Sequence, residues 1–280
     1  MKKLMMSALL TTALLTAPQT KDSLAGHTIV IDPGHGGRDS GAVANGLEEA
    51  PVALSLSRTI ARVLRSEGAH VVLTRGANRD VPADRYGSGL GHRNLAARVA
   101  FARKVHADLF LSIHANEYSR DSNIHGAQVF VGQSPDTSRT MLATCLQERL
   151  NRVTMTRWAV NQTQPLYLMG HLSIPGALVE TGYLSNPREA RLLLDSAHQE
   201  RLAAAIAQGL HCYYMRRSLP SPNARRLESS PGPRHSPAGP ATTGSGPEFG
   251  RAPGESVVPP RRIRQRPLPQ QMIHPRWDLA

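Results

Sequence analysis

Two patterns of apolar and polar positions alternate along the chain between residues 26 and 214. Short runs rich in β-branched and aliphatic residues are typical of buried strands; they occupy residues 27–32, 69–74, 109–113, 126–131 and 176–180, and residues 166–169 predict one more short strand. Apolar residues three and four apart predict helices; this spacing covers residues 51–67, 94–104, 138–151, 187–194 and 196–213. Alternating strands and helices predict an α/β fold: one domain with a largely parallel, twisted sheet of about five to six strands, covered by helices on both faces.

The two ends of the chain have a different character. Lys2 and Lys3 precede an apolar stretch at residues 4–17, which is short for a spanning helix but suits the core of a signal peptide. We therefore expect residues 1–25 to be a signal peptide or an N-terminal membrane anchor, with an amphipathic helix as the alternative. The expected location is extracytoplasmic, in the cell wall or at the membrane.

The C-terminal segment is rich in proline and arginine. Thirteen of the 21 prolines lie between residues 219 and 280, among few large apolar side chains. Such a composition does not bury enough surface to offset the entropy of ordering. We expect one folded domain at residues 26–217 and a disordered tail at residues 218–280.

The formal net charge is +12, and residues 218–280 contribute nine arginines against four acids. This balance favours anionic surroundings, so the N-terminus and the tail are expected to contact a membrane or an anionic wall polymer. A solvated tail without a dedicated partner explains the charge equally well. Nucleic acid is not expected, because aromatic residues are not interleaved with the basic ones. The oligomeric state is not predicted.

The two cysteines, Cys145 and Cys212, both lie in helical patterns among apolar neighbours. One disulfide is geometrically feasible, but two buried thiols are the commoner outcome, and we predict free thiols. The chain has no Cys-x-x-Cys spacing, which excludes a thiolate metal site.

Two histidines follow predicted strands directly. His35 stands in the run IDPGHGG and His114 in the run LSIHAN. The carboxyl ends of strands are where open α/β sheets place their binding sites. Glu48 and Glu49, just before the helix at residue 51, offer a carboxylate near the same edge. Two imidazoles and one carboxylate form a three-ligand metal site with an open position, as in zinc hydrolases.

Each of these residues also has a simpler interpretation. The glycines around His35 are compatible with a plain turn, and His114 with a hydrogen-bonded core histidine. Acids such as Glu48 and Glu49 are common at helix N-termini. The His-Glu-x-x-His pattern of helical metalloproteases is absent.

Glu180 ends the apolar strand at residues 176–180. An acid at the end of a buried strand is costly unless it is paired or functional. A general base beside an activated water is the role that a hydrolase needs there. Glu180 is therefore the candidate catalytic residue.

Four motifs together resemble the zinc-dependent N-acetylmuramoyl-L-alanine amidases: IVIDPGHGGRDSG, GLEE, LSIHAN and VETGYLSNP, in the family's order. The resemblance implies that His35, Glu49 and His114 bind Zn²⁺ and that Glu180 is catalytic. It implies peptidoglycan as substrate and hydrolysis of the amide between N-acetylmuramic acid and L-alanine. The family usually continues with lysine and aspartate after the glutamate; Ala50 and Pro51 stand here, so Glu48 remains an alternative ligand.

Residues 166–169 and 174–177 resemble the spore-cortex, germination-specific branch of the family. The implied role is spore-cortex maturation through formation of muramic lactam. Two alternatives are a non-catalytic wall-binding protein that retains a zinc fold, and a zinc deacetylase or amidase for another exported amide. The segments 75–91 and 116–126 either shape a substrate groove or are connectors.

Overall fold

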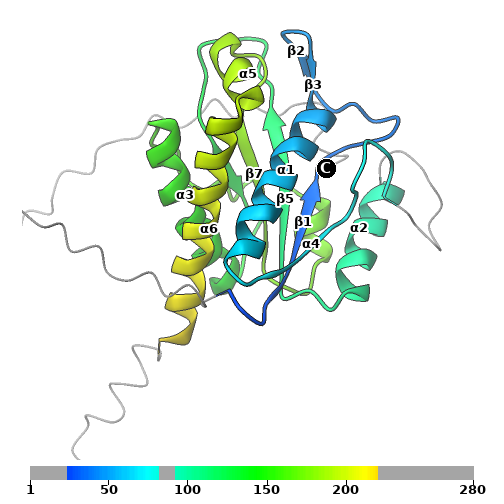
Figure 1. Ribbon diagram of the computed structural model, residues 1–280, viewed down its shortest axis with the longest axis vertical. Coiled ribbons are helices and arrows are strands. Elements are labelled where there is room, and N and C mark those ends of the chain that lie inside the picture. Colours follow the sequence, from blue (N-terminus) through cyan, green and yellow to red (C-terminus); the bar gives the residue numbers. More distant parts are fainter. Residues whose placement is uncertain (1–23, 82–91, 220–280) are drawn as a thin grey trace, which may run out of the picture. The chain divides into compact units, whose positions relative to one another are not determined.

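The computed structural model describes residues 24–81 and 92–219, and within them a central five-stranded sheet (Figure 1). The strands lie in the order β4 (His70–Leu73), β1 (Thr28–Pro33), β5 (Leu109–Asn116), β7 (Gly176–Tyr183) and β6 (Gln128–Phe130). The first four are parallel, and β6 is antiparallel to β7. The predicted α/β fold with a largely parallel sheet is confirmed.

Helices cover both faces of this sheet. On one face lie α1 (Glu49–Ser66), α3 (Thr137–Thr154), α5 (Pro187–Leu194) and α6 (Ser196–Ser218). On the other lie α2 (His92–Lys104) and α4 (Tyr167–His171) (Figure 1). Both faces of the sheet are therefore apolar, which explains why its strands read as continuous hydrophobic runs rather than as alternating ones.

Strand β5 shows how one strand serves two cores. Leu109, Leu111 and Ile113 belong to the core beneath α1, α3 and α6, whereas Phe110 belongs to the core beneath α2 and α4. Successive side chains of a strand point to opposite faces, so the two sets alternate. Being buried on both sides, β5 holds the residue at its end in a fixed position.

The strand predicted at residues 166–169 is wrong, because the segment forms the short helix α4. Leu168 and Met169 are buried there against the apolar face that carries Phe110. A four-residue apolar run has too few positions to distinguish a strand from a helical turn by periodicity. A two-stranded hairpin of β2 (Val43–Ala44) and β3 (Leu47–Glu48) was not predicted, since two residues per strand give no pattern.

The prediction of free thiols is also wrong. Cys145 in α3 and Cys212 in α6 form a disulfide, with their Cα atoms 5.8 Å apart. The two helices pack against each other over their length, and both cysteines are buried in the contact. The sequence shows that each cysteine lies on an apolar helix face, but not that these two faces meet.

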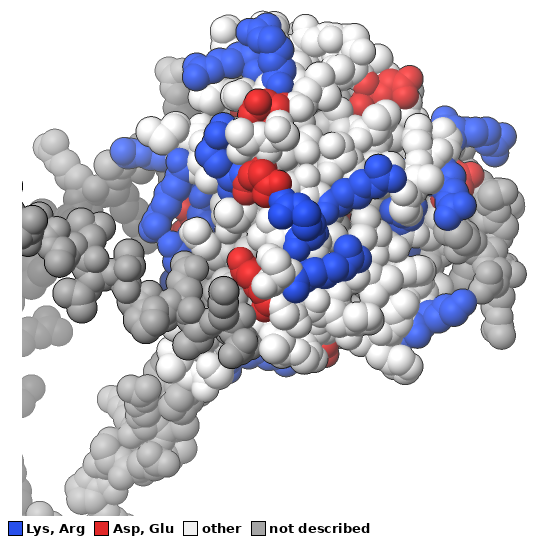
Figure 2. Space-filling model, in the orientation of Figure 1, with Lys and Arg blue, Asp and Glu red and all other residues white. Residues whose placement is uncertain are grey.

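The surface over α1, α3 and α6 carries Arg side chains with fewer acids among them (Figure 2). Ion pairs link neighbouring helices there: Arg62 with Glu200, and Arg216 with Glu148. Among the described residues, no helix has the length and apolar character needed to cross a membrane. Residues 1–23 and 220–280, which hold most of the predicted signal segment and tail, lie outside the described part.

The disulfide predicts a measurable contribution to stability. Because it closes a loop with a sequence separation of 67 residues, breaking it should lower the free energy of unfolding by about 2–4 kcal/mol. Denaturant unfolding with and without reductant measures this difference. The control is the double variant Cys145→Ala/Cys212→Ala, whose midpoint should not respond to reductant. An identical midpoint for the native chain in both conditions would contradict the prediction.

Candidate metal centre

Three side chains converge at the carboxyl edge of the sheet. His35 follows β1, His114 lies near the end of β5, and Glu49 is the first residue of α1. One ligand atom from each lies within 4.8 Å of the others. Because β1 and β5 are parallel neighbours, both histidines reach the same edge.

The turn after β1 is shaped to admit His114. A Cβ atom on Gly34 would lie 2.4 Å from Cε1 of the His114 ring, closer than any side chain tolerates. His35 itself adopts the left-handed backbone conformation, with φ of 57°, and Gly36 follows at 123°. The glycines thus serve close approach and an unusual turn, which are two reasons for this residue type.

Glu49 is oriented by the backbone on both sides. The amide of Ala42 donates to its Oε2 at 2.9 Å, and the amide of Ala115 donates to its Oε1 at 3.1 Å. Glu48, one residue earlier, is exposed in the hairpin strand β3. Of the two candidate glutamates, the structure therefore places Glu49 between the histidines.

Each histidine presents one ring nitrogen to Glu49. Nε2 of His35 lies 3.1 Å from Glu49 Oε2, and Nδ1 of His114 lies 2.8 Å from Glu49 Oε1. The other nitrogen of His35, Nδ1, is 2.8 Å from the carboxylate of Asp39. The rings meet edge to face, with centroids 4.9 Å apart.

Charge in this cluster is unevenly shared. Burial disfavours the imidazolium of His35, but the carboxylates of Glu49 and Asp39 outweigh it and raise its pKa to about 10. Burial lowers the pKa of His114. Burial alone would raise the pKa of Glu49, yet the two histidines hold it well below its usual range. The site therefore contains an ionised carboxylate that requires positive charge beside it.

The donor set fits a divalent cation. With a metal bound, Nδ1–H of His35 would donate to Asp39, and the lone pair of Nε2 would face the metal beside Glu49. Nδ1 of His114 is similarly close to the other oxygen of Glu49, so a proton or a metal ion must lie between each imidazole nitrogen and the carboxylate. Imidazole and carboxylate are ligands that zinc accepts, and a carboxylate behind a ligating histidine is a common supporting arrangement.

Glu180 lies beside this cluster on β7, where it is the register neighbour of His114. Its side chain is buried, and its Oε2 has no hydrogen-bond partner. Burial raises the pKa of Glu180 well above its usual range, and the charge of Glu49 raises it further. An unsatisfied buried carboxyl oxygen is costly, which makes Glu180 a candidate for a functional role.

Two buried arginines hold the turn that carries His35. Arg75 donates to the carbonyls of Pro33 and Gly34, and Arg98 donates to those of Pro33 and His35. Burial and the neighbouring Arg98 lower the pKa of Arg75 to about 10, so it keeps its charge at neutral pH. Neither arginine was singled out from the sequence, because their spacing from His35 carries no local pattern.

Asp39 was missed for a different reason. It lies four residues after His35 in the run HGGRD. The sharp backbone turn between them brings the Asp39 carboxylate into direct contact with the ring of His35. An acid so close to a candidate ligand histidine is a signal that could have been used.

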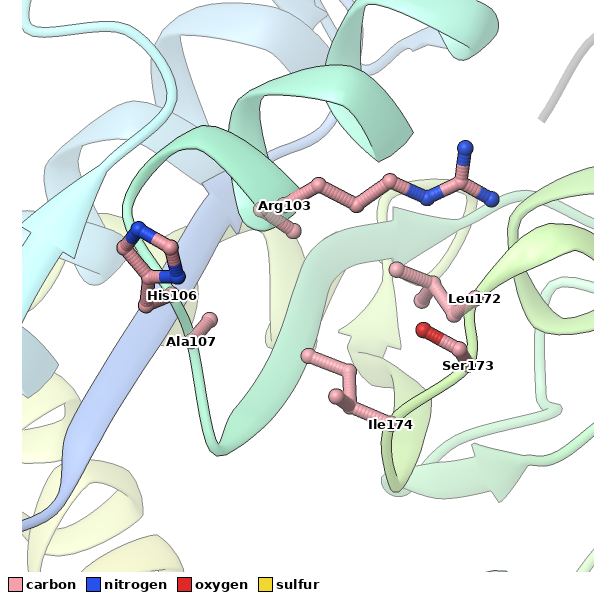
Figure 3. Close-up of a pocket in the computed structure, with 7 residues that line it drawn as sticks. Arg103, His106, Ala107, Leu172, Ser173 and Ile174 are labelled. Atoms are coloured by element: carbon pink, nitrogen blue, oxygen red, sulfur yellow. The ribbon is translucent and has the colours of Figure 1, made fainter.

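The other described histidines do not join the cluster. Within residues 24–81 and 92–219, the group formed by His35, Glu49 and His114 is the one with metal-binding geometry. His106 lines a separate pocket of about 240 Å³ with Arg103, Leu172 and Ile174, below the starts of β5 and β7 (Figure 3). That pocket lies at the opposite edge of the sheet and is not part of the site.

Comparison with known proteins relates this chain to a family. Residues 29–212 match the family model described as N-acetylmuramoyl-L-alanine amidase. The germination-specific N-acetylmuramoyl-L-alanine amidase of Bacillus subtilis is 32% identical over 201 residues, which are 70% of this chain and 84% of that protein.

Two solved structures are similar as well. One is the CwlD amidase from Clostridioides difficile in complex with the GerS lipoprotein, with a TM-score of 0.61 and 31% identity over 68% of this chain and 98% of that one. The other is the amidase AmiC2 of Nostoc punctiforme, with a TM-score of 0.58 and 31% identity over 68% of this chain and 99% of that one. The chain belongs to the N-acetylmuramoyl-L-alanine amidase family.

Proposed function

We propose that this chain is a zinc-dependent peptidoglycan hydrolase that cleaves the amide bond between N-acetylmuramic acid and the L-alanine of the stem peptide. The observation that carries the proposal is the convergence of His35, Glu49 and His114 beside the buried Glu180, in a chain of this family. The family supplies the substrate class, and the cluster supplies groups suited to amide hydrolysis.

The residues that would hold zinc are His35 through Nε2, His114 through Nδ1, and Glu49 through its carboxylate. Zinc, when bound, supplies Lewis acidity: it polarises a carbonyl oxygen and lowers the pKa of a water molecule toward about 7. The hydrogen bonds from Ala42 and Ala115 hold Glu49 in place, and Asp39 holds the ring of His35.

Glu180 is the proposed proton carrier. Its carboxylate accepts a proton from the attacking water and returns a proton to the amino group of L-alanine as the amide breaks. A carboxyl group with a raised pKa suits both steps near neutral pH. The burial of its carboxyl group limits competition from bulk water.

The proposed setting is the spore cortex, outside the cytoplasm. It is supported by the similarity to the germination-specific amidase of B. subtilis and to CwlD. Residues 26–217 are the proposed catalytic domain, with residues 1–25 as signal or anchor and residues 218–280 as a basic tail. Contact of the basic segments with a membrane or an anionic wall polymer remains part of this proposal.

Two other functions make different demands on the site. A wall-binding protein that keeps the metal as a scaffold has no need of an unsatisfied buried acid at Glu180. A deacetylase would release acetate from peptidoglycan, whereas the proposed reaction exposes new L-alanine amino groups. Digestion of purified peptidoglycan followed by analysis of both products separates the three functions.

Removal of either histidine should abolish zinc binding and activity together. His35→Ala and His114→Ala each leave two of three ligands, so we expect no stoichiometric zinc and no release of L-alanine amino groups above background. Metal analysis of the purified protein and the peptidoglycan digest measure the two effects. The control is His171→Ala, which changes an exposed histidine remote from the cluster. A variant that keeps full zinc content would remove that histidine from the ligand set.

Glu180→Gln should separate binding from catalysis. The amide keeps the shape of the side chain but does not accept a proton, so we expect zinc content near one ion per chain and a loss of turnover of at least about 10²-fold. Steady-state digestion of peptidoglycan measures the loss. Glu48→Gln is the matched control, because Glu48 is an exposed acid next to the site. Near-normal turnover in Glu180→Gln would assign the proton transfer to another group.

A further inference from the structure

On the side away from Glu49, the ring of His114 contacts a buried hydrogen-bond network. Its Nε2 lies 3.2 Å from the hydroxyl of Ser112, and that hydroxyl donates to Oδ2 of Asp32 at 2.9 Å. Asp32 and Ser112 are register partners on the adjacent strands β1 and β5. Their exposed fractions are zero, and that of His114 is 5%. This hydrogen-bond network therefore lies in the interior of the sheet, shielded from water.

The donor and the acceptor of each hydrogen bond in this network follow from the chemistry of the groups. An ionised carboxylate only accepts hydrogen bonds, so the single proton of Ser112 goes to Asp32. The hydroxyl oxygen of Ser112 is then left with lone pairs alone. In a neutral His114 ring, Nε2 is then the donor to Ser112, and Nδ1 is left with a lone pair on the side of Glu49, where a bound cation would lie between them.

Asp32 is held so that only one of its oxygens serves Ser112. Its Oδ1 accepts from Arg98 Nη1 and from the hydroxyl of Thr74, each at 2.5 Å. The same Arg98 donates to the carbonyl of His35 at 2.7 Å. One buried carboxylate is thus connected to both histidines, to one through Ser112 and to the other through Arg98.

We propose that Asp32 and Ser112 are positioning residues that select the tautomer of His114 with its proton on Nε2, and so turn Nδ1 toward the metal. The inference rests on the proposed zinc function and adds residues that do not touch metal or substrate. Supporting groups of this kind typically change metal affinity about 10- to 100-fold when removed.

The first test is zinc affinity. Ser112→Ala removes the acceptor for Nε2–H, and we expect its zinc dissociation constant to rise about 10- to 100-fold in competition with a chromophoric chelator. Thr74→Val is the matched control: it removes a hydrogen bond to the same carboxylate but leaves Ser112 between Asp32 and His114. We expect the smaller change in Thr74→Val. Equal affinities of Ser112→Ala and the native protein, or an equal loss in both variants, would overturn the proposal.

The second test uses the native protein loaded with zinc. Long-range nitrogen–proton NMR should show His114 with a protonated, slowly exchanging Nε2 and a metal-bound Nδ1. In Ser112→Ala, exchange of that Nε2–H with water should become faster. A His114 bound through Nε2 in the native protein would overturn the proposal without any variant.

Asp32→Asn gives an independent check. Its amide can donate to Ser112, which frees the serine proton to turn toward His114, so zinc affinity should fall as in Ser112→Ala. Thermal unfolding of the metal-free variants shows whether each variant is folded. If a variant is unfolded, the NMR result on the native protein decides the proposal. Native protein that binds no zinc would overturn the proposed function itself, whereas native binding with unchanged variants overturns only the roles of Asp32 and Ser112.

Discussion

The structure depends on one electrostatic constraint: an ionised, buried carboxylate lies between two imidazoles, and a ring nitrogen of each is 2.8–3.1 Å from its oxygens. Glu49 has 5% exposure and accepts two backbone amides, so it cannot move away from either ring. Charges buried without compensation are strongly destabilising. A cation at this point, either protons on the histidines or a divalent metal, is what makes the arrangement tenable.

The fold meets this constraint by fixing each ligand from a different direction. Parallel strands β1 and β5 bring both histidines to one edge, while the hairpin of β2 and β3 delivers the start of α1 and with it Glu49. Behind the ligands, Arg75 and Arg98 hold the carbonyls of the turn that carries His35. The contacts that support the ligands are thus as well defined as the ligands themselves. Such contacts keep water out of a buried site and hold its ligands in the correct orientation.

Much of the fold was predictable because it depends on local patterns. Strands such as Leu109–Asn116 are buried on both faces and are apolar throughout, and Pro187 marks a helix start that the structure shares. The segment at residues 166–169 was not predictable, since so short an apolar run fits a strand and a helical turn equally. The pairing of Cys145 with Cys212 depends on which helices are neighbours, a property of the tertiary structure alone.

The residues of the site likewise fall into those that local sequence patterns indicate and those that only the tertiary structure reveals. His35 and His114 could be singled out because each follows a predicted strand, and parallel strands place their ends together. The choice of Glu49 over Glu48 required the structure, since the hairpin exposes one and turns the other inward. Asp32, Ser112 and Arg98 come from three elements, β1, β5 and α2, and no spacing along the chain announces their contact.

Anomalous X-ray scattering at the zinc absorption edge tests the central claim most directly. Crystals of protein purified without added chelator should show one strong peak, bonded to His35, Glu49 and His114 and adjacent to the carboxyl group of Glu180. A peak bonded to other residues would contradict the account. So would zinc-containing crystals in which these three side chains contact no metal.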